Sequence, residues 1–504
     1  MATRRFFNRL FLSILLLFSR SAAAPAADAV ASAAIDWNKV VRVSRTTPTL
    51  QVVVNPQLRR GASMHDAAFR TLHDLGCDLV RYVPWLPYPK LAVAELDPPR
   101  DGKTFWDFSL IDPVMADFMD ATAGHSVVIN FSAIPQWMYK TPQPVPYPVD
   151  PDQVTWNYEQ GTELRDPTRK ELAGYYQRLV SWYTQGGFKD EFGKWHGSDH
   201  HYKIDYWEVF NEVDDEHSMT PQEYTASYDA IVEAIRQVAP HMKFVALALD
   251  ETGHHPEFFE YFLNPRHHKP GIPLDMVSYH FYASPTGDQS PEVQQYTFFD
   301  QMDGFLNVVR YVDSIRERLS PRTQTDVNEL GAISGDDRSQ NLPGHVTKPI
   351  PNSYWNLSAA LYAYAFGEMA RMGIEAVGES QLVGYPTQYP SVSLVDWALN
   401  KPNARAWVLK LLRENFGPGD KLAASGPENQ ELFIQGFVTR DGRHKVLLVN
   451  KRDRTQIVSI PGATGGSVAV VDQETAFEPP AHGQLRNDQV TLGGLAVAVV
   501  TLAQ

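Results

Sequence analysis

The sequence predicts a (β/α)₈ barrel followed by a small β-sandwich, and three observations support this prediction. Short apolar segments alternate with helical segments from residue 47 to residue 415. Beyond Gly417-Pro418-Gly419 the helical pattern stops and only short alternating strands remain. The chain of 504 residues is too long for one compact core, which favours a large barrel with an appended domain. An open, doubly wound sheet is the alternative arrangement of the same alternating elements.

The predicted barrel strands are short, apolar and rich in β-branched residues, as is typical of strands in a buried parallel sheet. They span residues 50–54, 78–83, 126–131, 202–210, 242–248, 274–280, 325–330 and 374–378. The predicted helices span residues 64–75, 110–123, 169–185, 221–238, 256–263, 294–319, 354–371 and 401–415. One helix has a clear start, because Thr220 is a capping residue and Pro221 fits the first turn.

Residues 416–504 are predicted to form the β-sandwich. Segments 431–439 and 445–450 alternate apolar and polar residues on either side of Arg440-Asp441-Gly442, a pattern typical of a β-hairpin. Segments 467–471 and 495–502 continue as strands with no helix between them. We expect residues 36–46 to add an N-terminal strand to this domain, which leaves 47–415 for the barrel.

Residues 1–24 predict a secretory signal peptide. Arg4, Arg5 and Arg9 precede an apolar run over residues 10–18, and alanines at 22–24 supply small residues for cleavage. The arginine pair is also compatible with the twin-arginine export route. No later segment approaches the length of a membrane span. We therefore expect a secreted or periplasmic protein that has no membrane partner once the signal is removed.

Composition excludes several classes of protein. The chain has 45 Lys+Arg against 59 Asp+Glu, and this net charge of −14 argues against a nucleic-acid partner. A single cysteine, Cys77, excludes an intramolecular disulfide and a cysteine-based zinc site. Histidines at 196, 200, 201, 254, 255, 267 and 268 make a metal site an alternative. We expect no metal and no cofactor, because adjacent loop histidines are mostly surface residues.

Two glutamates lie where barrel enzymes place their chemistry. The fourth predicted strand ends in Asn211-Glu212, and the seventh ends at Glu329. Active sites of these barrels form at the carboxyl ends of the strands, so the two acids are expected to face each other across the barrel mouth. Cleavage of a glycosidic bond needs such a pair, one carboxyl protonated and the other ionised. The predicted partner is therefore an oligosaccharide or glycoside substrate, and the oligomeric state is left open.

The segment from Trp207 to Glu212 resembles the strand-four motif of a large clan of retaining glycosidases. The order of elements is most similar to glycoside hydrolase family 39, the β-xylosidase and α-L-iduronidase group. This resemblance implies that Glu212 is the general acid/base, that Glu329 is the nucleophile and that Asn211 hydrogen-bonds the substrate 2-hydroxyl. Val213 stands where the family usually has Pro, and Leu330 stands where an aromatic residue is common, which leaves the substrate in doubt.

Four further residues are candidates for the site. By the same resemblance, His280 and Tyr282 line it, with Tyr282 hydrogen-bonding the nucleophile; the alternative for His280 is a satisfied strand histidine. Arg81 is expected either to orient Glu329 and keep it ionised or to form a buried structural ion pair. Trp137 is expected to stack on a sugar ring, with simple packing as the alternative.

Glu208, deeper on the fourth strand, competes with Glu212 as the acid, but we expect it to pair with a base inside the barrel. The long connections 135–166 and 331–349 leave the catalytic end of the barrel, so they are expected to shape the pocket.

The sequence therefore predicts a secreted retaining glycosidase that resembles a β-xylosidase. An endo-acting polysaccharide hydrolase and a carbohydrate-binding barrel without turnover are the alternatives.

Overall fold

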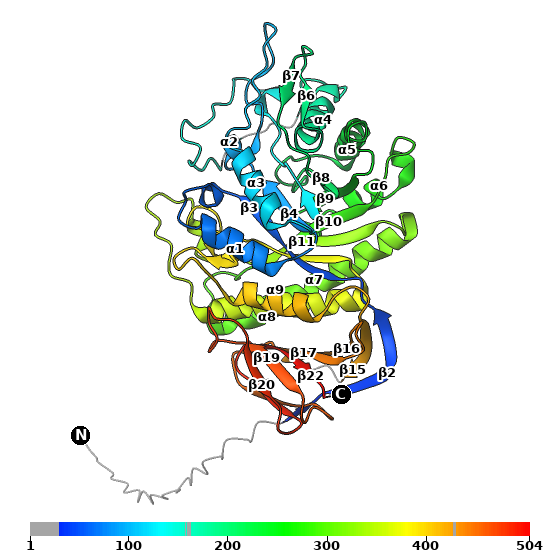
Figure 1. Ribbon diagram of the computed structural model, residues 1–504, viewed down its shortest axis with the longest axis vertical. Helices are drawn as coiled ribbons and strands as arrows, with labels where there is room; N and C mark the ends of the chain where they lie inside the picture. Colours follow the sequence, from blue (N-terminus) through cyan, green and yellow to red (C-terminus); the bar gives the residue numbers. More distant parts are fainter. Residues whose placement is uncertain (1–29, 157, 159–162, 427–429, 504) are drawn as a thin grey trace, which may run out of the picture.

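The computed structural model describes residues 30–156, 158, 163–426 and 430–503 (Figure 1). The predicted signal peptide, residues 1–24, lies outside the described residues. Among those residues, no helix is both long and apolar enough to cross a membrane.

The central element is a closed barrel of eight parallel strands, which confirms the predicted fold class and excludes the open sheet. In barrel order the strands are β3 (Thr47–Val54), β4 (Val80–Pro84), β5 (Val127–Ile129), β8 (Tyr206–Val209), β9 (Lys243–Leu249), β10 (Met276–Ala283), β11 (Gln324–Ala332) and β12 (Ala376–Glu379). β12 pairs with β3 and closes the ring. Each predicted strand overlaps one of these, although most boundaries differ by a few residues.

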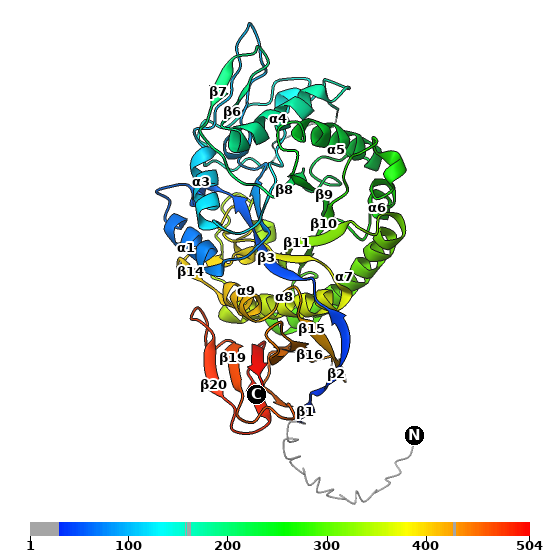
Figure 2. The ribbon, with the colours of Figure 1, turned by 45° about the vertical axis from the view of Figure 1, so that its right-hand side comes forward.

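Helices form an outer ring around the strands (Figure 2). They are α1 (His65–Leu75), α3 (Asp112–Ala121), α4 (Lys170–Thr184), α5 (Pro221–Ile235), α6 (Pro256–Phe262), α7 (Pro291–Leu319), α8 (Asn352–Met372) and α9 (Ala404–Asn415). Thr220 caps α5 as predicted, since its hydroxyl accepts from the Glu223 backbone N–H and the Glu223 carboxylate accepts from the Thr220 N–H. The short α2 (Pro89–Ala92) and the hairpin of β6 (Gly187–Lys189) and β7 (Trp195–Gly197) were not predicted.

The C-terminal domain contains two sheets. The larger has the order β2-β15-β16-β17-β22-β19-β20, and the smaller has the order β1-β18-β21. The larger comprises β2 (Ala34–Val43), β15 (Lys421–Gly426), β16 (Leu432–Val438), β17 (His444–Asn450), β22 (Val497–Thr501), β19 (Ser467–Val471) and β20 (Ala481–Gln484); the smaller comprises β1 (Ala31–Ser32), β18 (Gln456–Ser459) and β21 (Gln489–Leu492). The predicted hairpin forms, because β16 and β17 pair antiparallel. The N-terminal β2 pairs antiparallel with β15.

The two parts of the molecule pack against each other through α8 and α9, which lie directly above the C-terminal sheet in Figure 1. Gly367 in the middle of α8 permits this close approach. A Cβ atom at Gly367 would lie 2.3 Å from the ring of Phe433 on β16, so a larger residue would displace that ring.

Candidate active site

A cavity of about 410 Å³ opens at the carboxyl ends of the barrel strands. Its walls come from those strand ends and from the loops that follow them. The lining residues are Gln51, Val53, Val83, Trp85, Leu86, Trp156, Tyr158, Asn211, Glu212, Asp215, Glu216, Asp250, Tyr282, Glu329, Ile333, Ser380, Gln381, Tyr389 and Val392. The pocket thus contains both glutamates singled out in the sequence.

Glu212 and Glu329 face each other across this pocket. A carboxylate oxygen of Glu212 and one of Glu329 lie within 4.8 Å of each other, and a nitrogen of His280 lies within the same distance of both. Glu212 follows β8 in a strained loop, where Phe210 has φ 65° and Glu212 has φ 41°. The Glu212 N–H donates to the carbonyl of Ala248 (2.8 Å), which anchors the loop to the end of β9.

Glu329 receives a donor on each carboxylate oxygen. Arg81 Nη1 donates to Oε1 (2.5 Å), and the Tyr282 hydroxyl donates to Oε2 (2.5 Å). His280 Nε2 lies 3.6 Å from Oε1. Burial by itself raises the pKa of Glu329, but the nearby His280 and Arg81 and the donated hydrogen bonds outweigh it, so the pKa is below its ordinary value. The site therefore favours an ionised Glu329.

Glu212 is in the opposite electrostatic situation. Its Oε1 lies 3.0 Å from His280 Nδ1, but its other neighbours are acids. Burial raises its pKa well above the ordinary value, and the charges of Asp250 and Glu329 raise it further. The site therefore favours a protonated Glu212 beside an ionised Glu329.

Arg81 is the hub of a buried polar layer beneath the pocket. Besides Glu329, its guanidinium contacts Glu208 Oε2 (2.5 Å), Gln51 Oε1 (2.7 Å) and Asn211 Oδ1 (2.5 Å). The prediction that Glu208 pairs with a base inside the barrel is confirmed. Both alternatives considered for Arg81 are present together, because one guanidinium holds Glu329 and also pairs with Glu208.

The remaining predicted residues divide into two groups. Asn211 and Tyr282 line the pocket, and Asn211 Nδ2 also donates to Glu216 (3.0 Å). His280 contacts both glutamates, yet it lies behind them and is not among the lining residues.

Trp137, which was expected to stack on a sugar ring, is not among the residues that line the pocket. Its indole N–H donates to the carbonyl of Glu95 (2.7 Å), and the guanidinium of Arg165 covers one face of its ring at 4.4 Å. These contacts fit the alternative of simple packing, since Trp137 is partly buried against the main core. The aromatic walls are formed instead by Trp85, Trp156 and Tyr389, whose rings pack edge to face or at a tilt.

Several lining residues were missed in the sequence. Asp250 directly follows β9, so the rule that places chemistry at strand ends could have identified it. Asp215 and Glu216 lie on the same loop as Glu212, a proximity that could have drawn attention to them. Gln51 and Ser380 carry no sequence signal, because any barrel strand contains such residues.

Two groups of side chains in the described residues have ligand atoms close enough for a metal ion: Glu212 with His280 and Glu329, and Glu212 with Asp215 and Asp250. In the first group, the carboxylate of Glu329 already accepts hydrogen bonds from Arg81 and Tyr282. The histidines singled out in the sequence do not gather into one site. His196 pairs with Asp190, His200 with Asp112 and His268 with Asp229, each in a separate place.

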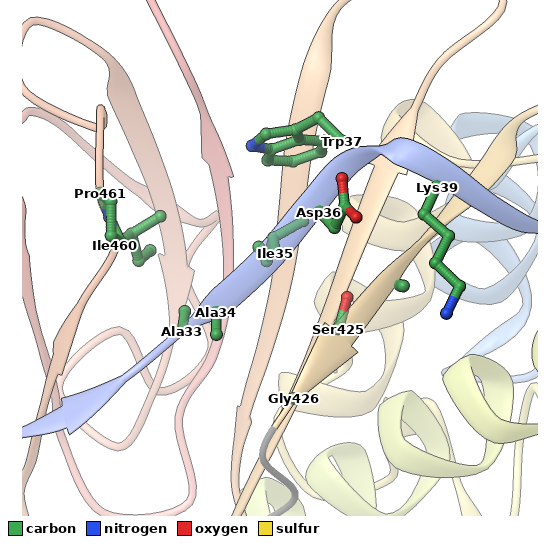
Figure 3. A pocket seen from close by; sticks show the side chains of 11 residues that line it. Ala33, Ala34, Ile35, Asp36, Trp37, Lys39, Ser425, Gly426, Ile460 and Pro461 are labelled. Atoms are coloured by element: carbon green, nitrogen blue, oxygen red, sulfur yellow. The ribbon is translucent and has the colours of Figure 1, made fainter.

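A second hollow of about 500 Å³ lies on the C-terminal domain, lined by the paired strands β2 and β15 and by Ile460 and Pro461 after β18 (Figure 3). Figure 3 shows Trp37 above it and Asp36 and Lys39 on the strand beside it. It is larger than the barrel pocket, but its lining residues include only one acid, Asp36, and so lack a pair of facing carboxyls. Of the two hollows, the barrel pocket is the one that holds paired carboxyls.

Residues 433–500 match a family model described as the C-terminal immunoglobulin-like domain of D-apionate lactonase. This match runs from β16 to β22 and excludes the barrel. No curated protein matches the chain.

Solved structures similar to this chain include sugar-cleaving enzymes. A GH51 arabinofuranosidase from Xanthomonas axonopodis pv. citri is 10% identical with a TM-score of 0.60, and the match covers 94% of this chain and 99% of that one. A glucosidase from Croceicoccus marinus is 14% identical with a TM-score of 0.60, over 95% and 99% of the two chains. A GH30 endoxylanase from Clostridium papyrosolvens C71 is 14% identical with a TM-score of 0.57, over 94% and 100%. At such low identity the likeness establishes the shared fold.

Proposed function

We propose that the protein is a retaining glycoside hydrolase with Glu329 as nucleophile and Glu212 as general acid/base. One observation carries the proposal: two carboxyls with oxygens within 4.8 Å have opposite electrostatic surroundings. Retaining enzymes hold their carboxyls about 5–5.5 Å apart, whereas inverting enzymes need about 6.5–9.5 Å to admit a water molecule. The short separation favours retention.

The proposed reaction has two steps. Glu329 attacks the anomeric carbon while Glu212 gives its proton to the leaving oxygen, and a covalent glycosyl-enzyme forms. Glu212, now ionised, then takes a proton from water, which attacks the anomeric carbon and releases Glu329. His280 Nδ1 is placed to donate to Glu212 Oε1, which leaves Oε2 to carry the proton toward the substrate. No metal or cofactor is required.

We propose an exo-acting enzyme for a neutral sugar, in line with the resemblance to the β-xylosidases of family 39. Loops from around the barrel wall the pocket, which supports binding of a chain end more than an open groove would. The ionisable lining groups other than tyrosines are all acids, and they include Asp215, Glu216 and Asp250 beside the glutamate pair. Arg81 is the nearest strong cation, and Glu208, Glu329, Gln51 and Asn211 already occupy its donors. Among the pocket residues that the structure describes, a uronic acid would therefore find no free cation.

The test is replacement of Glu329 by Ala. We expect hydrolysis of aryl glycosides to fall by about 10⁴-fold or more, because the covalent route is lost. Added azide fits the space left by the carboxylate and should restore turnover with formation of a glycosyl azide. Unchanged activity in the variant would refute the assignment of Glu329. We further propose that this activity is secreted or periplasmic, because residues 1–24 have the pattern of a signal peptide.

A second candidate function is hydrolysis of a sugar lactone. The match of residues 433–500 to a domain of D-apionate lactonase favours it, but that match lies outside the pocket. Assaying the protein with aldonolactones alongside aryl glycosides separates the two. Polysaccharide substrates in the same panel test endo action, and binding without turnover of any of them would support a carbohydrate-binding barrel.

A further inference from the structure

Glu216 joins two residues of the pocket wall, and the mechanism above gives it no role. It lies in the loop between β8 and α5, and its Oε1 accepts a hydrogen bond from Nδ2 of Asn211 on the same loop (3.0 Å). The same oxygen accepts from the indole N–H of Trp85, which directly follows β4. All three residues line the pocket. One carboxyl oxygen therefore connects the loops that follow two different barrel strands.

The amide of Asn211 is held at both ends. Its Oδ1 accepts from Arg81 Nη2 (2.5 Å), and because arginine has only donors, the NH₂ group of the amide is the end that faces Glu216. This group has two protons, and only the one directed at Glu216 has a partner among the residues that the structure describes. We expect the second proton to be accepted by the 2-hydroxyl of the substrate, in line with the resemblance to family 39.

The carboxyl of Glu216 has the surroundings of a neutral acid. Oε1 already accepts two hydrogen bonds, whereas Oε2 is buried and has no partner among the described residues. An ionised carboxylate would leave negative charge on that buried oxygen with no donor to stabilise it. Burial raises the pKa of Glu216 well above its ordinary value, and the charges of Glu212 and Glu329 raise it further, which outweighs the two donated hydrogen bonds. The proton then belongs on Oε2, and Oε1 remains the acceptor.

We propose that Glu216 is a positioning residue that, as a neutral hydrogen-bond acceptor, fixes the substrate-facing N–H of Asn211 and the indole of Trp85 in one arrangement. The proposal rests on the proposed function, since it concerns the wall that receives the sugar. Glu216 acts through these two residues, because they occupy its Oε1 and its Oε2 is closed to solvent. Without this shared acceptor, the amide of Asn211 keeps only its bond to Arg81, and the indole N–H of Trp85 loses its acceptor.

Two replacements separate the acceptor from the rest of the side chain. Glu216→Met keeps about the same length but has no carboxyl oxygen, whereas Glu216→Gln keeps an acceptor oxygen and has the shape of the neutral acid. We expect Glu216→Met to lower kcat/KM for an aryl glycoside about 10- to 100-fold. Glu216→Gln should be at least about tenfold more active than Glu216→Met, because both donors keep their acceptor.

The 2-hydroxyl of the substrate reports the position of Asn211. The measurement is the ratio of kcat/KM for an aryl glycoside to that for its 2-deoxy analogue, with β-D-xylosides, α-L-arabinofuranosides and β-D-glucosides as the panel. In Glu216→Met this ratio should fall about tenfold, since a displaced amide no longer distinguishes the two substrates, and Glu216→Gln should keep it. General damage to the site lowers kcat/KM for both substrates alike, so an unchanged ratio in Glu216→Met overturns the proposal.

The pH profile of Glu216→Gln tests the neutral state of the carboxyl. An ionised Glu216 would raise the pKa of Glu212, so its replacement would move the alkaline limb of kcat/KM to lower pH. A neutral Glu216 has no such effect, and we expect the limb to stay within about 0.3 pH unit of that of the unmodified protein. A larger movement overturns the proposal, and this measurement decides the question even if Glu216→Met does not fold.

Covalent trapping separates this inference from the proposed function. The probes are 2-deoxy-2-fluoro aryl glycosides of the same three sugars, with the labelled residue identified by mass spectrometry. If none of them labels Glu329 of the unmodified protein, the proposed function and this inference both fail. If Glu329 is labelled but Glu216→Gln is no more active than a folded Glu216→Met, only the inference is overturned. Unfolding curves of both variants show whether they are folded.

Discussion

Glu212 and Glu329 place carboxylate oxygens within 4.8 Å of each other, although they belong to strands on different sides of the barrel. Two carboxyls this close do not both ionise readily, and their surroundings decide which one keeps the proton. Arg81 and Tyr282 donate to Glu329, whereas Asp250 faces Glu212. The asymmetry assigns the two roles and leads to four predictions.

The first prediction concerns Asp250 and the pH profile. A protonated Glu212 and an ionised Glu329 together give a bell-shaped dependence, with Glu212 setting the alkaline limb. Asp250, whose own pKa is raised to about 6 mainly by burial, is the charge that contributes most to the raised pKa of Glu212. Asp250→Asn should therefore lower the pKa of Glu212 and move the alkaline limb of kcat/KM down by about one pH unit.

The control for this prediction is Asp215→Asn. Asp215 belongs to the same group of acids, but it is exposed to solvent, which screens its charge. We expect the alkaline limb of kcat/KM to move less in Asp215→Asn than in Asp250→Asn. If the alkaline limb moves equally in both variants, or moves to higher pH in Asp250→Asn, Asp250 is not the main charge that raises the pKa of Glu212.

The second prediction concerns Glu212 itself. Glu212→Gln removes the acid that protonates the leaving oxygen, so aryl glycosides with poor leaving groups should lose about 10²- to 10⁴-fold in kcat/KM. A dinitrophenyl glycoside needs no such proton, and its first step should be nearly unaffected. Steady-state and burst kinetics over a series of phenols measure this difference. Equal losses for all leaving groups would exclude Glu212 as the acid.

The third prediction concerns the charge of the substrate. Asp215 and Asp250 line the pocket together with the ionised Glu329, so a uronide carboxylate would meet like charges. Because such contacts cost several kcal/mol, an aryl glucuronide should have a kcat/KM at least about 100-fold below that of the aryl glucoside. Asp250→Asn should reduce the difference in kcat/KM between the glucuronide and the glucoside. Equal turnover of the two glycosides would show that the acids do not select the sugar.

The fourth prediction concerns Asp326, an acid on β11 that is buried beneath the site. Neither of its carboxylate oxygens has a hydrogen-bond partner among the residues the structure describes. Burial, and then the charge of Glu208, raises its pKa from 3.8 to about 8. A carboxyl whose pKa is raised in the folded state contributes stability that is fully present below pH 3.8, its ordinary pKa. This contribution is lost as the pH rises from that value through about 8.

Asn has the shape of the protonated acid but does not titrate. At about pH 4, Asp326→Asn should therefore have the same free energy of unfolding as the unmodified protein. As the pH rises, the unmodified protein loses stability relative to the variant, and the difference should reach up to about 4 kcal/mol near pH 7. Urea unfolding across this range measures the free energy of unfolding. A constant difference between the two proteins at all pH values would contradict the raised pKa.

Part of the site follows from local rules that a linear sequence carries. Glu212 and Glu329 were identified because each ends a strand of a parallel barrel, and such ends converge at one mouth. Glu208 was assigned to the interior because it lies deeper than Glu212 on the same strand, and it pairs with Arg81 as expected. The Thr220 cap was visible because it depends on residues three positions apart.

Other parts depend on distant segments and were not predictable. Trp137 is held outside the pocket by Glu95 and Arg165, while Trp85 and Trp156 form its walls. The path of a long loop depends on which side chains it packs against, and no spacing in the sequence records those contacts. Glu216 is similarly fixed by hydrogen bonds from Asn211 and the indole of Trp85.

The sequence by itself determined the barrel, the β-sandwich and the two facing glutamates, because strand periodicity, caps and strand ends are local properties of a chain. Only the tertiary structure decided which glutamate keeps its proton. Burial and the charges of Arg81, His280 and Asp250 act through space, and these residues come from three other strands or their ends.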